Sequence, residues 1–178
     1  MEFLYWGLGF VLLLSACITI LAVFQKKRVQ KRKNDIIKLF TLACKKKNIT
    51  DFKMEYVKKS THDFYFENEK HIYYIKVIYN FSNQEICINN AIKWQLRKLG
   101  EVKQNMTFVE DIEPLMRLEL ENSIKKEHKL FIIYPNVTAL LKVINECEMA
   151  FVYPDTDVYG AQVIPYKRLI EDTELIEL

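Results

Sequence analysis

The longest apolar stretch of the chain runs from Phe3 to Phe24 and contains no charged residue. A helix of these 22 residues would be roughly 33 Å long, enough to cross the hydrocarbon core of a bilayer. The pattern therefore predicts a transmembrane helix over residues 3–24. A cleaved secretory signal is disfavoured because a basic n-region and a shorter apolar core are missing. The segment ending at Cys17 resembles a bacterial lipidation site, but cutting there would leave an apolar start, so we expect a plain anchor.

The next part of the chain changes from helical to alternating periodicity. Residues 35–47 keep their apolar positions on one broad face and predict a helix. Either Asn34 or Asp35 caps its start, or the helix continues from the anchor through the basic residues. The segments that follow alternate apolar with polar residues or are rich in β-branched and aromatic residues, which is typical of strands. The predicted strands are residues 51–59, 62–67, 71–79 and 84–90.

The second half of the chain predicts strands mixed with helices. Residues 91–100 are typical of a short helix ending at a glycine, and 101–128 form a long polar excursion. The apolar run 129–135 is typical of a buried parallel strand. We expect the remaining elements to be a helix over 136–148, strands over 149–153 and 161–165, and a closing helix over 166–172. This order predicts an α/β fold, a mixed sheet with flanking helices, in addition to the transmembrane helix.

Basic residues are concentrated directly after the apolar run. Residues 26–47 carry a net charge of +9, whereas residues 48–178 carry −5. An excess of Lys and Arg on this flank predicts a single-pass membrane protein, with its N-terminus outside and its C-terminal domain in the cytoplasm. We expect the collar, residues 25–34, to contact anionic lipid rather than nucleic acid, because lipid is already adjacent. The residues of this membrane-surface contact are Lys26, Lys27, Arg28, Lys31, Arg32 and Lys33.

The rest of the chain, residues 35–178, has the size of one ordinary domain. Its cysteines have no zinc-type spacing, so we expect reduced, buried thiols. The cations that follow Cys44 favour a lowered pKa for its thiol. His62, His71 and His128 share no metal-ligand spacing, so we expect no metal site and no cofactor. Four glycosylation sequons are expected to stay unused in a cytoplasmic domain, and they begin at Asn48, Asn80, Asn105 and Asn136.

The segment HDFYFENEKHIYYIKVIY, residues 62–79, lies at the centre of the predicted order of elements. This order resembles the restriction-endonuclease-like fold, and especially the membrane-anchored nuclease-related domains of bacteria. Active members of that superfamily have an Asp opening the second strand, an acid–x–Lys triplet on the third, and often a Gln on the next helix. Asp63, Lys76 and Gln95 match the Asp, Lys and Gln positions. The resemblance implies that the acids hold Mg²⁺, which activates water, and that the Lys stabilises charge on the phosphate.

The acid position of the triplet is occupied by Tyr74. A tyrosine cannot supply the anionic oxygen that a hard divalent cation prefers. Apart from the resemblance, Asp63 fits a residue at a strand start, and Lys76 fits a strand residue with a packed stem and a solvated charge.

We therefore expect a membrane-anchored domain without catalysis, used for binding a protein partner or for positioning at the membrane. Nucleic acid is not the expected partner, because the domain is acidic. The alternative is a metal-dependent nuclease acting on DNA or RNA, with Asp63, Lys76 and Gln95 as catalytic residues and Mg²⁺ as the cofactor. The missing acid favours a protein that is not an enzyme, and the sequence leaves both hypotheses open.

Overall fold

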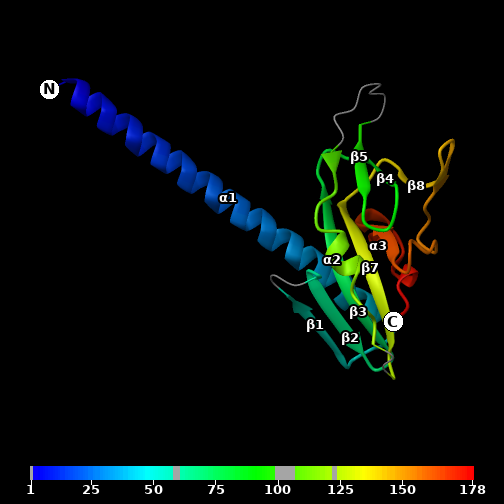
Figure 1. Cartoon of the computed structure of the whole chain (residues 1–178). Coiled ribbons are helices and arrows are strands. Elements are labelled where there is room, and N and C mark those ends of the chain that lie inside the picture. The colour runs from blue at the N-terminus through cyan, green and yellow to red at the C-terminus, as the bar shows by residue number, and fades with distance from the viewer. Residues whose placement is uncertain (1, 58–60, 99–106, 122–123) are drawn as a thin grey trace. The chain divides into compact units, whose positions relative to one another are not determined.

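The computed structural model describes residues 2–57, 61–98, 107–121 and 124–178 (Figure 1). The described chain separates into two compact units, Met1–Phe40 and Thr41–Leu178, and each is considered by itself. The second unit contains all the strands that the structure describes.

The first element is one uninterrupted helix, α1 (Glu2–Lys46). It runs through the basic collar, so Asn34 and Asp35 lie inside the helix rather than at its start, and their predicted capping role is wrong. Within the described residues, no helix is both long and apolar enough for a membrane span. The side chains of residues 1–14, 16 and 17 are outside that description, and the span over residues 3–24 stays a prediction.

The first sheet has the strand order β1-β2-β3-β7-β10. Its strands β1, β2 and β3 form an antiparallel meander, whereas β7 runs parallel to both β3 and β10. Figure 1 shows β2, β3 and β7 side by side. The bounds are Phe52–Tyr56 for β1, Phe64–Asn68 for β2, His71–Asn80 for β3, Lys126–Pro135 for β7 and Gln162–Pro165 for β10.

The apolar run in β7 is explained by burial on both faces of this sheet. Residues 130–133 are all buried, although neighbouring side chains of a strand point to opposite faces. A strand covered on both sides needs apolar residues at consecutive positions, and the predicted parallel strand is thereby confirmed.

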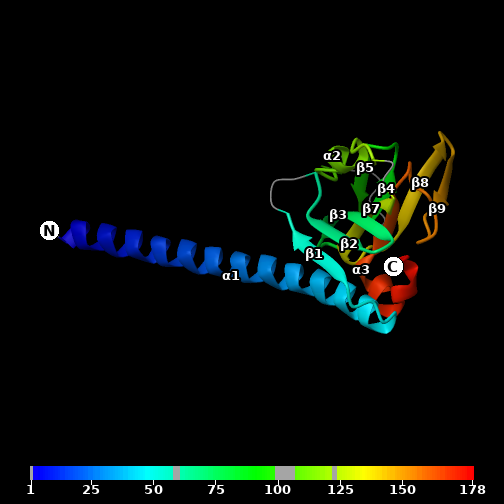
Figure 2. The ribbon, with the colours of Figure 1, turned by 90° about the horizontal axis from the view of Figure 1, so that it is seen from below.

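The second sheet has the order β6-β5-β4-β8-β9 and is also mixed. Strands β4 and β8 are parallel, and the other pairs are antiparallel. Figure 2 shows β4, β5, β8 and β9 gathered beside the first sheet. The bounds are Glu85–Ile88 for β4, Trp94–Arg97 for β5, Thr107–Phe108 for β6, Leu140–Asn145 for β8 and Glu148–Phe151 for β9.

The helix predicted over residues 91–100 is wrong for its described part, because β5 lies there instead. The Asn90 carboxamide oxygen accepts hydrogen bonds from the backbone N–H groups of Ile92 and Lys93. This local turn sends the chain back along β4, which pairs with β5. Residues 99 and 100, like 101–106 and 122–123 of the predicted excursion, lie outside the described residues.

The helix predicted over residues 136–148 is also wrong. Strand β8 lies in the middle of this segment and pairs with β4, so that Leu140 lies opposite Ile86. The Asn145 side chain accepts a hydrogen bond from the Cys147 N–H and turns the chain into β9. A short apolar run suits a helix or a strand equally well by periodicity, and here the pairing with β4 decides.

A hydrophobic core joins the two sheets, and it includes the fully buried Trp94. The short helix α2 (Glu113–Met116) contributes Leu115 to this core. The closing helix α3 (Tyr166–Glu171) confirms the prediction over 166–172 and contacts β7 and β10. A 3₁₀ turn, η1 (Thr173–Leu175), follows it. The core residues from the sheets include Ile78, Phe131, Ile133 and Val163 of the first sheet and Ile86, Ile88, Trp94 and Leu140 of the second.

Candidate functional site

The structure brings Asp63 and Lys76 together at the start of β2. The backbone N–H of Asp63 donates to the Ile75 carbonyl over 2.8 Å. Its carboxylate Oδ2 accepts a 2.7 Å hydrogen bond from the Val77 N–H, and its Oδ1 lies 3.6 Å from the Lys76 Nζ. The side chains are 26% exposed for Asp63 and 13% exposed for Lys76. The carboxylate therefore ties the start of β2 to β3 and partly neutralises a largely buried ammonium.

A second acid reaches the same ammonium. Asp111 Oδ2 lies 3.9 Å from the Lys76 Nζ, although its side chain is 74% exposed. Asp111 lies between β6 and α2 and has a φ of 59°, in the left-handed region that Asp enters more readily than most residues. No local pattern in the sequence points to Asp111, because it is far from Asp63 and Lys76 along the chain and only folding brings it near.

These three side chains border a hollow of about 390 Å³. Glu110 lines it too, so the ionised groups there carry more negative than positive charge. Such a charge balance attracts a cation and repels a phosphate. Asp63 Oδ1 and Asp111 Oδ2 are the atoms that would hold Mg²⁺, which one or two carboxylates can bind. The Lys76 ammonium, however, already lies between these two atoms.

Tyr74 takes part in aromatic packing at the position where the nuclease pattern has an acid. Its ring makes edge contacts with His62 and Tyr65, at centroid distances of 5.1 and 5.8 Å. Burial raises the pKa of the Tyr74 phenol and lowers the pKa of His62. The phenol is therefore neutral at physiological pH and is not an anionic metal ligand.

The structure does not bring Gln95 to this site. Gln95 lies in β5, a strand rather than the helix expected, opposite Cys87 of β4. Among the described residues, its neighbour Leu96 lines the hollow and Gln95 does not. Consecutive strand side chains point to opposite faces, so the two cannot both face the hollow. In the structure Gln95 therefore lies apart from Asp63 and Lys76, and its catalytic role stays a prediction of the resemblance.

Glu67, the acid at the end of β2, is engaged elsewhere. Glu67 accepts a 2.8 Å hydrogen bond from the Tyr65 hydroxyl and pairs with Lys125 at 2.6 Å. The hydrogen bond from Lys125 lowers the pKa of this carboxyl. Neither Glu67 nor Glu69 is among the described residues that line the Asp63–Lys76 hollow.

Cys44 is buried, as expected for a reduced thiol, but the lowered pKa favoured by its neighbouring cations is wrong. Its side chain is fully buried, and this burial raises the pKa of the thiol more strongly than the charge of Lys47 lowers it. A raised pKa leaves less thiolate at neutral pH, so Cys44 is a packing residue.

Comparison with known proteins supplies no relative for this arrangement. The chain matches no protein-family model, no curated protein and no solved structure.

Proposed function

We propose that this protein is held at the membrane by its N-terminal helix. Its α/β domain has a restriction-endonuclease-like architecture and binds a protein partner at the membrane surface without cutting nucleic acid. The antiparallel meander followed by parallel strands in the first sheet supports the nuclease-like architecture. The uncharged run over residues 3–24 and the basic collar behind it support the membrane anchor and a cytoplasmic domain.

The observation that carries the proposal is the internal use of Asp63 and Lys76. One carboxylate oxygen of Asp63 accepts the Val77 N–H, and the other lies beside the Lys76 ammonium. A nuclease would need this carboxylate for its metal ion and this ammonium for the phosphate. Here both groups stabilise the junction of β2 and β3, and Tyr74 replaces the acid that would complete a metal site.

The test is a cleavage assay on the full chain purified in detergent. Linear and circular DNA and single-stranded RNA are incubated with Mg²⁺ or Mn²⁺. We expect no cleavage above the level of an Asp63→Asn, Lys76→Met double variant. Cleavage by the parent that is lost in each single variant, but kept in Glu55→Gln, would overturn the proposal. Glu55 is a suitable control because its carboxylate is half-exposed and pairs only at the surface with Lys53.

The location is tested separately in intact cells. We expect the full chain to stay in the membrane fraction after alkaline washing, and protease added outside to leave residues 41–178 intact. Neutralising the six basic collar residues should disturb the direction of insertion or weaken binding to vesicles containing anionic lipid. Release by alkali, or cleavage of the domain from outside, would contradict the proposed location.

A metal-dependent nuclease remains the second candidate, and Asp111 is the observation that favours it. It adds a second carboxylate next to Lys76, at a hollow open to a ligand. Under this alternative, Asp63 and Asp111 would hold Mg²⁺, which would activate a water molecule, and Lys76 would contact the phosphate. The Asp111→Asn variant distinguishes the two proposed functions. The Asp111 side chain is exposed, so the variant should keep its fold, and any loss of cleavage would come from the lost carboxylate. Activity lost in this variant and kept in Glu55→Gln would establish the nuclease.

A further inference from the structure

We propose a transition-metal site formed by His71, His128 and Glu177, which binds a divalent cation of the Zn²⁺ or Co²⁺ type. This site lies apart from the Asp63–Lys76 hollow and does not depend on the proposed function. Among the described residues, these three offer ligand atoms that all lie within 4.8 Å of one another.

The pairing of β3 with β7 places the two histidines together. In this parallel pair, His71 lies opposite Lys126 and Tyr73 lies opposite His128. The two histidines are therefore diagonal neighbours on one face of the sheet, because side chains two residues apart in a strand share a face. Their rings meet with His71 Nδ1 3.0 Å from His128 Nε2. The ring of Tyr73 stacks on His128 at a centroid distance of 4.3 Å and fixes its plane.

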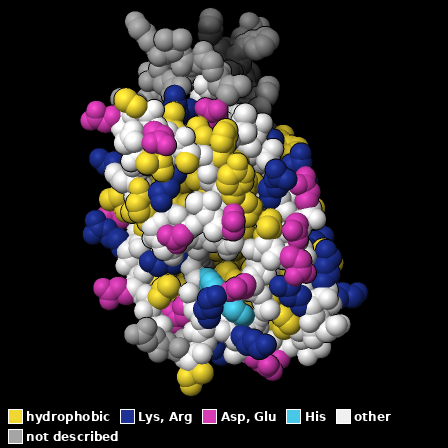
Figure 3. Space-filling model, turned by 90° about the vertical axis from the view of Figure 1, so that its right-hand side faces the viewer, with side chains coloured by type: hydrophobic (Ala, Val, Ile, Leu, Met, Phe, Trp, Pro, Cys, Tyr) yellow, Lys and Arg dark blue, Asp and Glu magenta, His cyan; other side chains and the backbone are white. Residues whose placement is uncertain are grey.

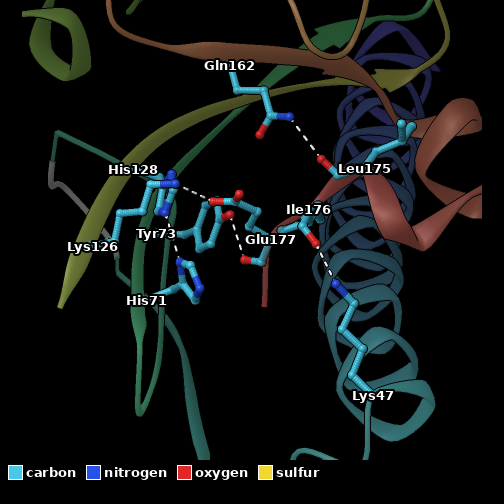
Figure 4. Close-up of polar contacts among 9 residues, drawn as sticks. All are labelled: Lys47, His71, Tyr73, Lys126, His128, Gln162, Leu175, Ile176 and Glu177. Atoms are coloured by element: carbon cyan, nitrogen blue, oxygen red, sulfur yellow. Dashed lines mark hydrogen bonds and ion pairs between the residues drawn. The ribbon is translucent and has the colours of Figure 1, made fainter.

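The third ligand, Glu177, lies in the segment after η1. Three successive backbone carbonyl groups of this segment accept hydrogen bonds from side chains of other elements. The carbonyl of Leu175 accepts from Gln162, and that of Ile176 accepts from Lys47. The carbonyl of Glu177 accepts a 2.7 Å hydrogen bond from the Tyr73 hydroxyl. Figure 4 shows these bonds together with the pair of histidines beside Glu177. Ile176 is buried, so Glu177 is held over the β3–β7 face rather than left on a loose end.

The three donors can reach one transition metal if the Glu177 carboxylate moves in toward the two histidine nitrogens, because the ligand atoms lie within 4.8 Å of one another. Zinc binds nitrogen and oxygen donors at about 2.0–2.2 Å, so two donors of a tetrahedral site lie about 3.4 Å apart. The histidine nitrogens need to separate only slightly from their 3.0 Å hydrogen bond. Two imidazoles and one carboxylate suit Zn²⁺ or Co²⁺, whereas Mg²⁺ and Ca²⁺ prefer oxygen ligands alone.

The site is open on one side. His128 and Glu177 line a hollow of about 450 Å³, which Asp155 and Asp157 border as well. Figure 3 shows histidine side chains reaching the surface among acidic and basic groups. Three protein ligands with an open side leave a fourth position for water, which is the arrangement of exchangeable and catalytic zinc sites.

Lys126 should weaken metal binding, and replacing it therefore tests the proposed site. Its ammonium pairs with Glu177 Oε2 at 2.5 Å, so a metal must displace it or use the other oxygen. A cation this close also repels the metal charge. Removing the ammonium should therefore tighten metal binding, whereas removing a ligand should weaken it.

The experiment titrates the full chain in detergent with Zn²⁺ by calorimetry and with Co²⁺ by visible absorption, at neutral pH. A Cys147→Ser background is used because this exposed thiol could bind the metal itself. We expect one metal per chain and a Co²⁺ spectrum typical of tetrahedral coordination. Glu177→Gln and His128→Ala should each weaken binding more than about tenfold, since changes outside the ligand shell already cost about 10- to 100-fold. Lys126→Met should strengthen it.

His62→Phe is the matched control, because it removes the remaining histidine while keeping an aromatic ring beside Tyr74. We expect its affinity to equal that of the background. Glu177→Gln keeps the test decisive if His128→Ala does not fold, because the Glu177 side chain is 63% exposed. The absence of stoichiometric binding, or unchanged affinity in Glu177→Gln, would overturn the site.

Discussion

Replacing Asp63 by alanine tests whether its carboxylate joins β2 to β3. The substitution removes the acceptor of the Val77 N–H and the nearer partner of Lys76. Val77 is buried, with 4% exposure, so its N–H would lose a bond that water cannot readily replace. A hydrogen bond to a charged group contributes about 1.5–3 kcal/mol. The ion pair is partly exposed at Asp63, so it adds less than about 1 kcal/mol.

We therefore expect Asp63→Ala to lower the free energy of unfolding by about 2–3 kcal/mol. Asp63→Asn keeps an oxygen acceptor and should lose about 1 kcal/mol. The free energy is measured by denaturant unfolding of the full chain in detergent, with the fluorescence of the buried Trp94 as the signal. Hydrogen exchange gives a local measurement, because the Val77 amide should lose protection in the alanine variant.

The matched control is Glu55→Ala, which removes a half-exposed carboxylate paired with Lys53. This surface change should cost less than about 0.5 kcal/mol. Lys76→Met keeps the packed stem and should cost about 1 kcal/mol or less, and its effect should shrink once Asp63 is already alanine. If Asp63→Ala were as mild as Glu55→Ala, the carboxylate would have no structural role and the reasoning would be wrong.

Three further predictions concern the second compact unit. Tyr73→Phe removes the hydrogen bond to the Glu177 carbonyl and should cost about 1 kcal/mol, with faster hydrogen exchange in residues 173–178. Burial lowers the pKa of all three histidines, so below about pH 6.5 the unfolded chain binds more protons than the folded one. Metal-free protein should therefore be less stable at pH 5.5 than at pH 7.5 in denaturant unfolding, and a rise on acidification would contradict this. Iodoacetamide should modify the exposed Cys147 in native protein and reach Cys44 only after denaturation, as peptide mass spectrometry can check.

Some of the chemistry could be predicted from local sequence. The pairing of Asp63 with Lys76 follows from a hairpin whose two strands were predictable, because their positions are fixed once β2 and β3 align. Asp111 could not be assigned, since a polar segment carries no signal of where it will pack. The same is true of His71 and His128, whose separation along the chain hides their contact. The metal-ligand spacing rules detect ligands on one local element, whereas the three residues of the proposed site come from different parts of the chain.

The sequence by itself determined those elements whose residue pattern favours a single type of secondary structure. The alternation in β1 and the β-branched, aromatic residues of β3 suit a strand, and the apolar run of β7 suits a strand buried on both faces. Only the tertiary structure decided the segments around Trp94 and Leu140, whose apolar residues suit a helix or a strand. Pairing with β4 satisfies their backbone groups and buries both side chains in the core between the sheets. Whether these segments become strands depends on pairing partners that are distant in sequence, and a local residue pattern carries no information about those partners.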